Sequence, residues 1–143
     1  MLLDEQNLFS DKQAITASAA STNFINLGAA ATPAGGSVAL AQDMGGNLSI
    51  PLLIQVTTAF ATLTSLTVTV QTDDNSSFSS ATTVASTHAV PVASLVPGYI
   101  FPLTNVPIKT NERYVRLFYT VTGSNATAGA ITASIAGGIQ TNV

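Results

Sequence analysis

His88 is the single histidine of this chain, and it is the first residue to test for catalysis near neutral pH. A catalytic histidine needs a nucleophile beside it and a third group that orients it. Residues 86–90 do not form a nucleophile elbow, and Gly-x-Ser-x-Gly does not occur in the sequence. We interpret His88 as a surface or strand-end residue, and we expect that the protein is not an enzyme.

The sequence also offers little for binding a metal or a cofactor. It has no cysteine, so the usual zinc ligand sets cannot be assembled around one histidine. Asp73 and Asp74 are adjacent rather than alternating, and Phe78 stands where a calcium loop of the EF-hand type needs glycine. Gly35-Gly36-Ser37 and Gly45-Gly46 are not followed by the lysine of a phosphate-binding loop. We expect no metal and no cofactor, and a turn at residues 73–77.

Charge is scarce, and this narrows the choice of partners. Only 8% of the 143 residues are charged and the net charge is −3. The basic residues are too few for a cationic stripe along phosphates, so we expect no direct binding of nucleic acid; they are Lys12, Lys109, Arg113 and Arg116. The first six residues lack the pattern of a secretory signal, and no apolar run approaches the ~20 residues that span a bilayer, so we expect no membrane association. A weakly charged surface repels its neighbours weakly, which favours a protein held in an assembly.

In the segments that would position these residues, apolar and polar side chains alternate with a period of two residues. Residues 64–72 alternate apolar and Thr or Gln side chains, which predicts a half-buried strand. Residues 113–121 predict a second strand, with Val115, Leu117, Tyr119 and Val121 on one face and Tyr114, Arg116, Phe118 and Thr120 on the other. A turn at Gly123-Ser124-Asn125 and a strand over residues 128–136 follow. The other strands that we predict are residues 13–19, 23–27, 48–57, 82–87 and 99–103.

Many short strands separated by Gly, Asn and Pro turns, without a long amphipathic helix, predict an all-β fold. We expect a jelly-roll-like β-sandwich that forms a single domain over residues 13–143. Residues 1–12 are predicted to be a short extended N-terminal arm or an edge strand.

Two groups of residues are candidates for an interface. Arg116 lies between Tyr114 and Phe118 on one strand face, where it either anchors a contact or covers apolar surface with its stem. The arm contains Leu2, Leu3, Leu8 and Phe9 in a segment too short to build its own core. These side chains are expected to dock either on the protein's own sandwich, as an edge strand, or on a neighbouring subunit or the capsid shell, and we favour the second.

Five segments stand in a characteristic order along the sequence: residues 1–11, residues 20–28, residues 70–80 (Val70-Gln71-Thr72-Asp73-Asp74-Asn75-Ser76-Ser77-Phe78-Ser79-Ser80), residues 112–121 (Glu112-Arg113-Tyr114-Val115-Arg116-Leu117-Phe118-Tyr119-Thr120-Val121) and Thr127-Ala128-Gly129. With these segments the chain resembles the Bbp16 family of tailed-phage capsid cement (decoration) proteins. The resemblance implies a jelly-roll-like β-sandwich that forms a homo-oligomer. It further implies a position on the exterior of the virion capsid, across junctions between major capsid protein subunits, and it brings no catalytic residues.

The function we therefore expect is that of a structural capsid cement protein, made in the host cytoplasm and assembled as a dimer or trimer. The alternative is a carbohydrate- or receptor-binding β-sandwich of a phage fibre or adhesin. Sugar sites usually present an exposed aromatic platform, and this sequence has no Trp and three Tyr.

Overall fold

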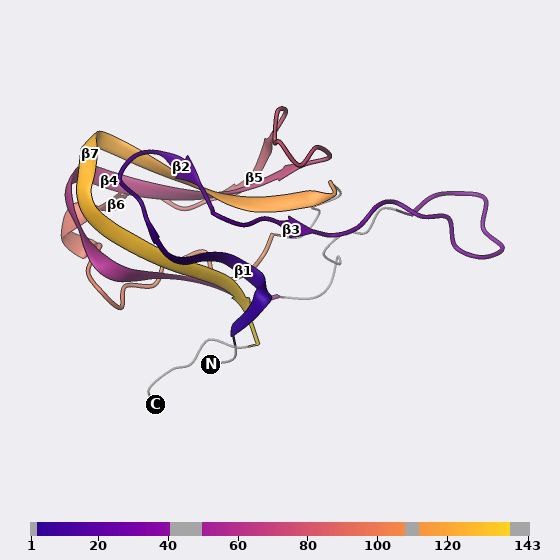
Figure 1. The fold of residues 1–143 in the computed structure, drawn as a ribbon, viewed down its shortest axis with the longest axis horizontal. Helices are drawn as coiled ribbons and strands as arrows, with labels where there is room; N and C mark the ends of the chain where they lie inside the picture. Colours follow the sequence, from indigo (N-terminus) through magenta and orange to yellow (C-terminus); the bar gives the residue numbers. More distant parts are fainter. Residues whose placement is uncertain (1–2, 41–49, 108–111, 138–143) are drawn as a thin grey trace.

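The computed structural model describes residues 3–40, 50–107 and 112–137 (Figure 1). Leu2, Gly45-Gly46 and Lys109, which the sequence analysis singled out, lie outside these ranges. The described residues form strands and one short 3-10 helix, which confirms the all-β class. The elements are β1 (Leu3–Ala14), β2 (Ala19–Ala20), β3 (Ile25–Asn26), β4 (Leu52–Asp73), β5 (Thr82–Ser86), β6 (Val90–Pro91), η1 (Val92–Ser94) and β7 (Tyr114–Ala136).

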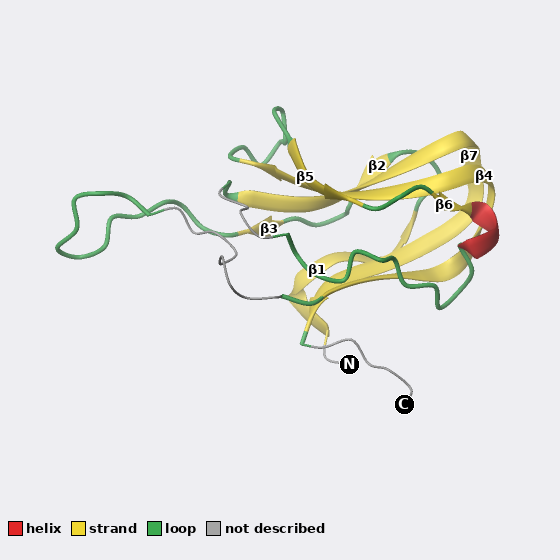
Figure 2. Ribbon diagram, turned by 180° about the vertical axis from the view of Figure 1, so that it is seen from behind, coloured by secondary structure: helices red, strands yellow, loops and turns green. Residues whose placement is uncertain are grey.

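The strands form one antiparallel sheet in the order β1-β7-β4-β5, with β2 and β3 on β7 and β6 on β4. The two long strands β4 and β7 pair from Leu52↔Ile135 to Asp73↔Tyr114. Both strands bend sharply, so that the two halves of the sheet face each other (Figures 1 and 2). The architecture is a curled open sheet. It does not confirm the jelly-roll sandwich that we expected, because β4 and β7 each run through both layers.

The bend corrects one prediction from the sequence. Gly123-Ser124-Asn125 was expected to be a turn between two strands, but β7 continues through it. Gly123 has a φ of 87°, and a β-carbon there would lie 2.2 Å from Oγ1 of Thr64. On the facing strand Thr62 has a φ of 74°, and its hydroxyl donates to the Asn125 carbonyl at 2.7 Å. The positive φ values and the register shifts around them bend the ladder without ending it.

The core lies between the two layers, and it contains the apolar face that the alternation predicted. Val115, Leu117 and Tyr119 of β7 are fully buried, as are Leu66 and Val68 of β4. The first half of β4 and the second half of β7 supply the opposite wall of the same core; this wall includes Leu52, Ile54, Val56, Ile131 and Ala133.

β1 lies at one edge of the sheet, antiparallel to β7. Phe9 is 1% exposed and belongs to the core, and Ser10 is fully buried beside it. Of the two docking sites that we considered for the arm, the protein's own sheet and another subunit or the capsid shell, Phe9 occupies the first, although we favour the second from the sequence. Burial of a large aromatic ring in a core that is already formed explains this outcome, since it needs no partner.

Only some of the shorter strands that we predicted match strands of the structure. Residues 82–87 nearly coincide with β5, whereas residues 99–103 contribute only a bridge between Ile100 and Gln55. Residues 13–19 do not form one strand, because β1 ends at Ala14 and β2 begins at Ala19. Among the described residues, no helix is long and apolar enough to cross a membrane.

Candidate contact surface

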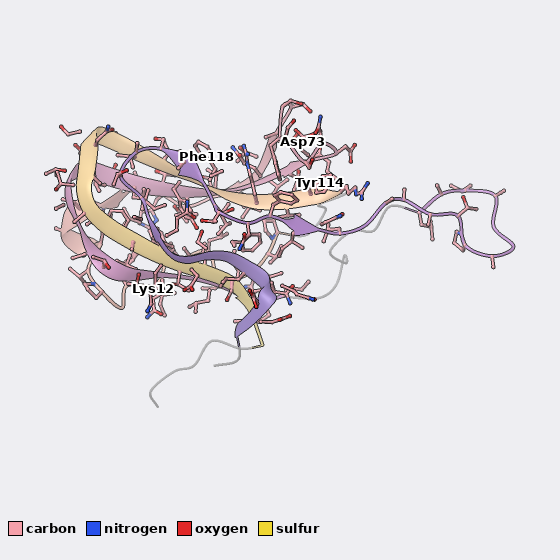
Figure 3. The ribbon with its side chains drawn as sticks, viewed as in Figure 1. Lys12, Asp73, Tyr114 and Phe118 are labelled. Carbon is pink, nitrogen blue, oxygen red and sulfur yellow. The ribbon has the colours of Figure 1, made fainter. Side chains whose placement is uncertain are left out.

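A cluster of aromatic rings and an arginine lies where β7 begins, on the sheet face opposite to the buried Val115, Leu117 and Tyr119; Figure 3 labels two of its members, Tyr114 and Phe118. We call it the ring cluster: Phe24, Phe78, Tyr114, Arg116 and Phe118. Phe24 lies just before β3, Phe78 lies in the turn after β4, and the other three residues alternate along β7. Three segments that are distant in sequence therefore meet at one place.

Three of the four rings, those of Phe24, Phe78 and Tyr114, contact one another edge to face, and Phe118 joins them through Arg116. The centroids of Phe24 and Tyr114 are 5.4 Å apart with an interplanar angle of 86°, and those of Phe24 and Phe78 are 5.9 Å apart at 65°. This arrangement places the positive ring edge against the negative ring face, which makes it more favourable than a stacked sandwich. Phe24 is 45% exposed, Tyr114 and Phe118 are half-buried and Phe78 is buried, so the cluster presents mainly the Phe24 ring to the outside.

Arg116 is held over the rings. Its Cζ lies 4.1 Å from the centroid of Phe78 and 5.7 Å from that of Phe118, and its Nε donates to Oε1 of Gln71 at 2.9 Å. Burial lowers the pKa of Arg116 and the charge of Asp73 raises it, but an arginine stays protonated at any working pH. The result is a fixed positive charge on an aromatic surface, a combination enriched in protein interfaces.

The turn that carries Phe78 is anchored by Asp73. Its carboxylate accepts hydrogen bonds from the backbone N–H of Asn75 at 2.9 Å and from that of Ser80 at 2.7 Å. The bond from Asn75 is the largest cause that lowers the pKa of Asp73; burial acts in the opposite direction, and Ser80 adds to the lowering. Phe78 itself has a φ of 52°, rare for a bulky residue. The anchored turn therefore holds Phe78 in an unusual conformation against Arg116.

Arg113 ties the ring cluster to β3 and to the turn after β4. Nε of Arg113 donates to Oδ1 of Asn26 at 3.0 Å, and its Cζ lies 5.0 Å from the Tyr114 ring. The backbone N–H of Arg113 donates to Oδ1 of Asp74 at 3.2 Å. β3, the turn after β4 and the start of β7 are thus linked by side chains as well as by the sheet.

Of the residues that we predicted at an interface, Tyr114, Arg116 and Phe118 come together here. Leu8 and Phe9 lie elsewhere, on β1, and Leu3 is its first residue. Phe24 and Phe78 were missed. The sequence did contain one usable hint, because both phenylalanines stand in polar loop segments where a large apolar side chain needs a partner.

The acidic residues and the single histidine are the possible metal ligands within the part of the chain that the structure describes. No group of three or more His, Cys, Asp or Glu side chains among them is placed to hold a metal ion. His88 is exposed in the segment between β5 and β6. An open cleft of about 320 Å³ runs beside β1, lined by Asp4, Glu5, Leu8, Asp11 and Thr132. Its carboxylates are its main polar feature.

Comparison with known proteins places this chain in a family. The family model Bbp16 matches residues 9–135, so the chain belongs to the Bbp16 family. A search of curated proteins found no match.

Proposed function

We propose that this Bbp16-family protein is a structural capsid cement (decoration) protein. It binds the exterior of a bacteriophage head and stabilises the junctions between major capsid protein subunits. The observation that carries the proposal is the ring cluster, in which Arg116 is held over Phe78 and Phe118 and the Phe24 ring is exposed. Membership of the Bbp16 family over residues 9–135 supports it, together with the resemblance of the sequence to cement proteins.

The physical demands of such a role suit this molecule. A cement protein makes many modest contacts that the symmetry of the shell repeats, so avidity replaces individual affinity. Each bound copy stabilises the assembled shell by mass action. Contacts of this kind need a pre-organised surface, and side chains from three segments hold the ring cluster in place.

The rest of the proposal follows from the family resemblance. We propose a homo-oligomer, dimer or trimer, on the outside of the capsid, without direct contact to nucleic acid or membrane. A jelly-roll-like β-sandwich stays part of the proposal, supported by the two facing halves of the sheet.

The test is to mix the purified protein with undecorated phage heads and to look by cryo-EM for added exterior density. Tyr114→Ala and Arg116→Ala should lower the occupancy of that density, because they remove a ring and the charge above it. Ser124→Ala, an exposed change on the same strand, is the matched control and should bind as wild type.

Heads with bound protein should also survive heating better than bare heads. Absence of exterior density at saturating protein, or equal melting of decorated and bare heads, would contradict the proposal.

One observation favours the alternative of a carbohydrate-binding module. The Phe24 ring is partly exposed near Asn26 and Arg113, so an apolar platform stands beside polar groups. A glycan array separates the two functions: sugar binding without capsid binding would favour the adhesin. Phe24→Ala should then abolish the glycan signal.

A further inference from the structure

The cleft beside β1 is not used by the proposed function. It has a volume of about 320 Å³ and is lined by Asp4, Glu5, Leu8, Asp11 and Thr132. We call it the acidic cleft. It holds three of the seven acidic residues of the sequence, and Lys12 is the single basic residue of β1. In a chain with so few charges, this excess of negative charge makes the cleft suited to a cation.

The cleft exists because β1 follows β7 irregularly. Leu3 pairs with Ala136 and Leu8 pairs with Ser134, so five steps along β1 match only two steps along β7. Residues 4–7 therefore bulge out of the ladder, and two of the three carboxylates belong to this bulge. The third belongs to Asp11, after the next shift in register. The sheet thus brings the three carboxylates to one side of the same hollow.

A buried hydroxyl at the same place points to a ligand. Ser134 is fully buried, and its Oγ makes no hydrogen bond within the described part of the chain. Its side chain leaves β7 on the same face as that of Thr132, which lines the cleft. Its ladder partner on β1 is Leu8, which also lines the cleft. Because a buried hydroxyl without a partner costs free energy, Ser134 is an unused hydrogen-bonding group at the floor of the cleft.

The lining residues also indicate which kind of cation fits. A metal ion needs several oxygen ligands within about 2.0–2.6 Å. No group of three or more acidic side chains among the described residues is placed to hold one. An ammonium group instead donates three hydrogen bonds to oxygens spread around it. Leu8 is half-buried and offers an apolar wall to methylene groups. The cleft therefore fits an ammonium group on an aliphatic stem.

We propose that the acidic cleft binds a primary alkylammonium group, with the ammonium among the carboxylates of Asp4, Glu5 and Asp11. The stem packs on Leu8, and the Ser134 hydroxyl oxygen accepts one of the ammonium hydrogen bonds. A free polyamine and the lysine side chain of a peptide both carry this group. The inference concerns the free protein and does not depend on capsid binding.

The first experiment is an NMR titration of the protein with n-butylamine at low salt. The amide signals of Leu8 and Thr132 should shift most. Asp11→Asn should weaken binding about threefold to tenfold, because it removes one charged partner of the ammonium. Asp74→Asn is the matched control: it removes the same charge from the turn after β4 and keeps an oxygen for the Arg113 N–H. It should bind as wild type. Added salt should weaken binding, because it screens exposed charges.

The second experiment tests the buried hydroxyl with two measurements on Ser134→Ala. The variant should bind n-butylamine more weakly than wild type. Without ligand it should melt at the same temperature as wild type or higher, because the hydroxyl that it removes has no partner in the fold. A merely structural hydroxyl would give the reverse, a lower melting temperature with unchanged affinity, and that result would remove Ser134 from the site.

Two further ligands distinguish the sources of the ammonium group. Tighter binding of spermidine than of a short lysine-containing peptide would assign the cleft to free polyamines, and the opposite order would assign it to lysine side chains. Four results would overturn the proposal. These are binding of none of the three amines, signal shifts spread evenly over the surface, equal affinity of wild type and Asp11→Asn, and displacement of n-butylamine by an equal concentration of Mg²⁺ or Ca²⁺.

Discussion

The ring of Phe60 lies against the backbone of Gly129, so close that a β-carbon on Gly129 would stand 2.2 Å from Cδ1 of the ring. Phe60 belongs to the bent part of β4 and is almost fully buried, while Gly129 is on β7 with a φ of 139°. The close approach lets the two strands curl around a core that includes this ring. A residue without a side chain is required on the facing strand for that contact.

Gly129→Ala should therefore destabilise the fold by about 1–3 kcal/mol or more, because the new methyl group overlaps a buried ring at a φ that disfavours alanine. Urea unfolding measures the loss. Two controls separate steric overlap from backbone strain. A β-carbon at Gly98, which has a φ of 92°, or at Gly137 would have no atom within 4 Å. Gly98→Ala reports backbone strain alone, and Gly137→Ala should be near neutral. A Gly129→Ala variant no less stable than Gly98→Ala would contradict the overlap.

Tyr119 and Ser10 join the edge strand to the core through their hydroxyl oxygens, which are 2.8 Å apart. Tyr119→Phe removes this bond and should cost about 1 kcal/mol, because Ser10 keeps its bond to Gln13. Thermal or urea unfolding at pH 7 measures it. Tyr99→Phe, a partly exposed tyrosine, is the control and should change stability less. Equal losses in the two variants would argue against a specific role for the Ser10 bond.

Burial of Tyr119 should make the fold less stable at alkaline pH. Burial is the largest cause that raises the pKa of this phenol far above its ordinary value, and the bond to Ser10 lowers it only in part. Above the ordinary pKa of about 10 the unfolded chain releases this proton while the folded chain keeps it, so stability falls as pH rises. Unfolding curves between pH 9 and 11 should show a shallower decline for Tyr119→Phe than for wild type. Parallel declines would show that Tyr119 does not drive the transition.

Asp73 should produce the opposite dependence at acid pH. Its pKa is lowered, chiefly by the hydrogen bond from Asn75, so the stability that it contributes is present above the ordinary pKa of about 4 and is lost as pH falls through the lowered value. Asp73→Asn should melt lower than wild type at pH 7 and should lose part of this acid sensitivity. Asp11→Asn, an exposed change of the same charge, is the control. Identical acid profiles for wild type and Asp73→Asn would be the contrary result.

Removal of residues 1–10 should lower the melting temperature, because it removes Phe9 from the core and Ser10 from Tyr119. Phe9→Ala alone should cost about 3–5 kcal/mol, the usual range for a buried ring. Leu8→Ala, at the neighbouring and only half-buried residue, should cost less. A truncated protein with unchanged melting but reduced capsid binding or oligomerisation would favour the alternative that the arm docks on another subunit or on the shell.

The candidate site was predictable only along β7. Tyr114, Arg116 and Phe118 share a face because side chains two apart on a strand point the same way, a property of local geometry. Phe24 and Phe78 reach the same place from loops, through a turn held by Asp73 and a strand pair made by Ile25. No local pattern encodes that meeting, since the distance between the rings depends on how three segments pack.

The sequence by itself determined the all-β class, the buried face of Val115, Leu117 and Tyr119, and the turn that begins at Asp73. These features depend on residues close together in the chain. Only the tertiary structure decided that β7 continues through Gly123. Gly-Ser-Asn occurs both in turns and in bent strands, so the local sequence does not distinguish the two. The pairing of β7 with β4 on both sides of Gly123 selects the bent strand. The tertiary structure likewise decided that Phe9 lies in its own core. Burial of an apolar ring contributes a similar free energy in its own core and in an interface with another subunit. Only the folded sheet shows that its own core is the one that the Phe9 ring can reach.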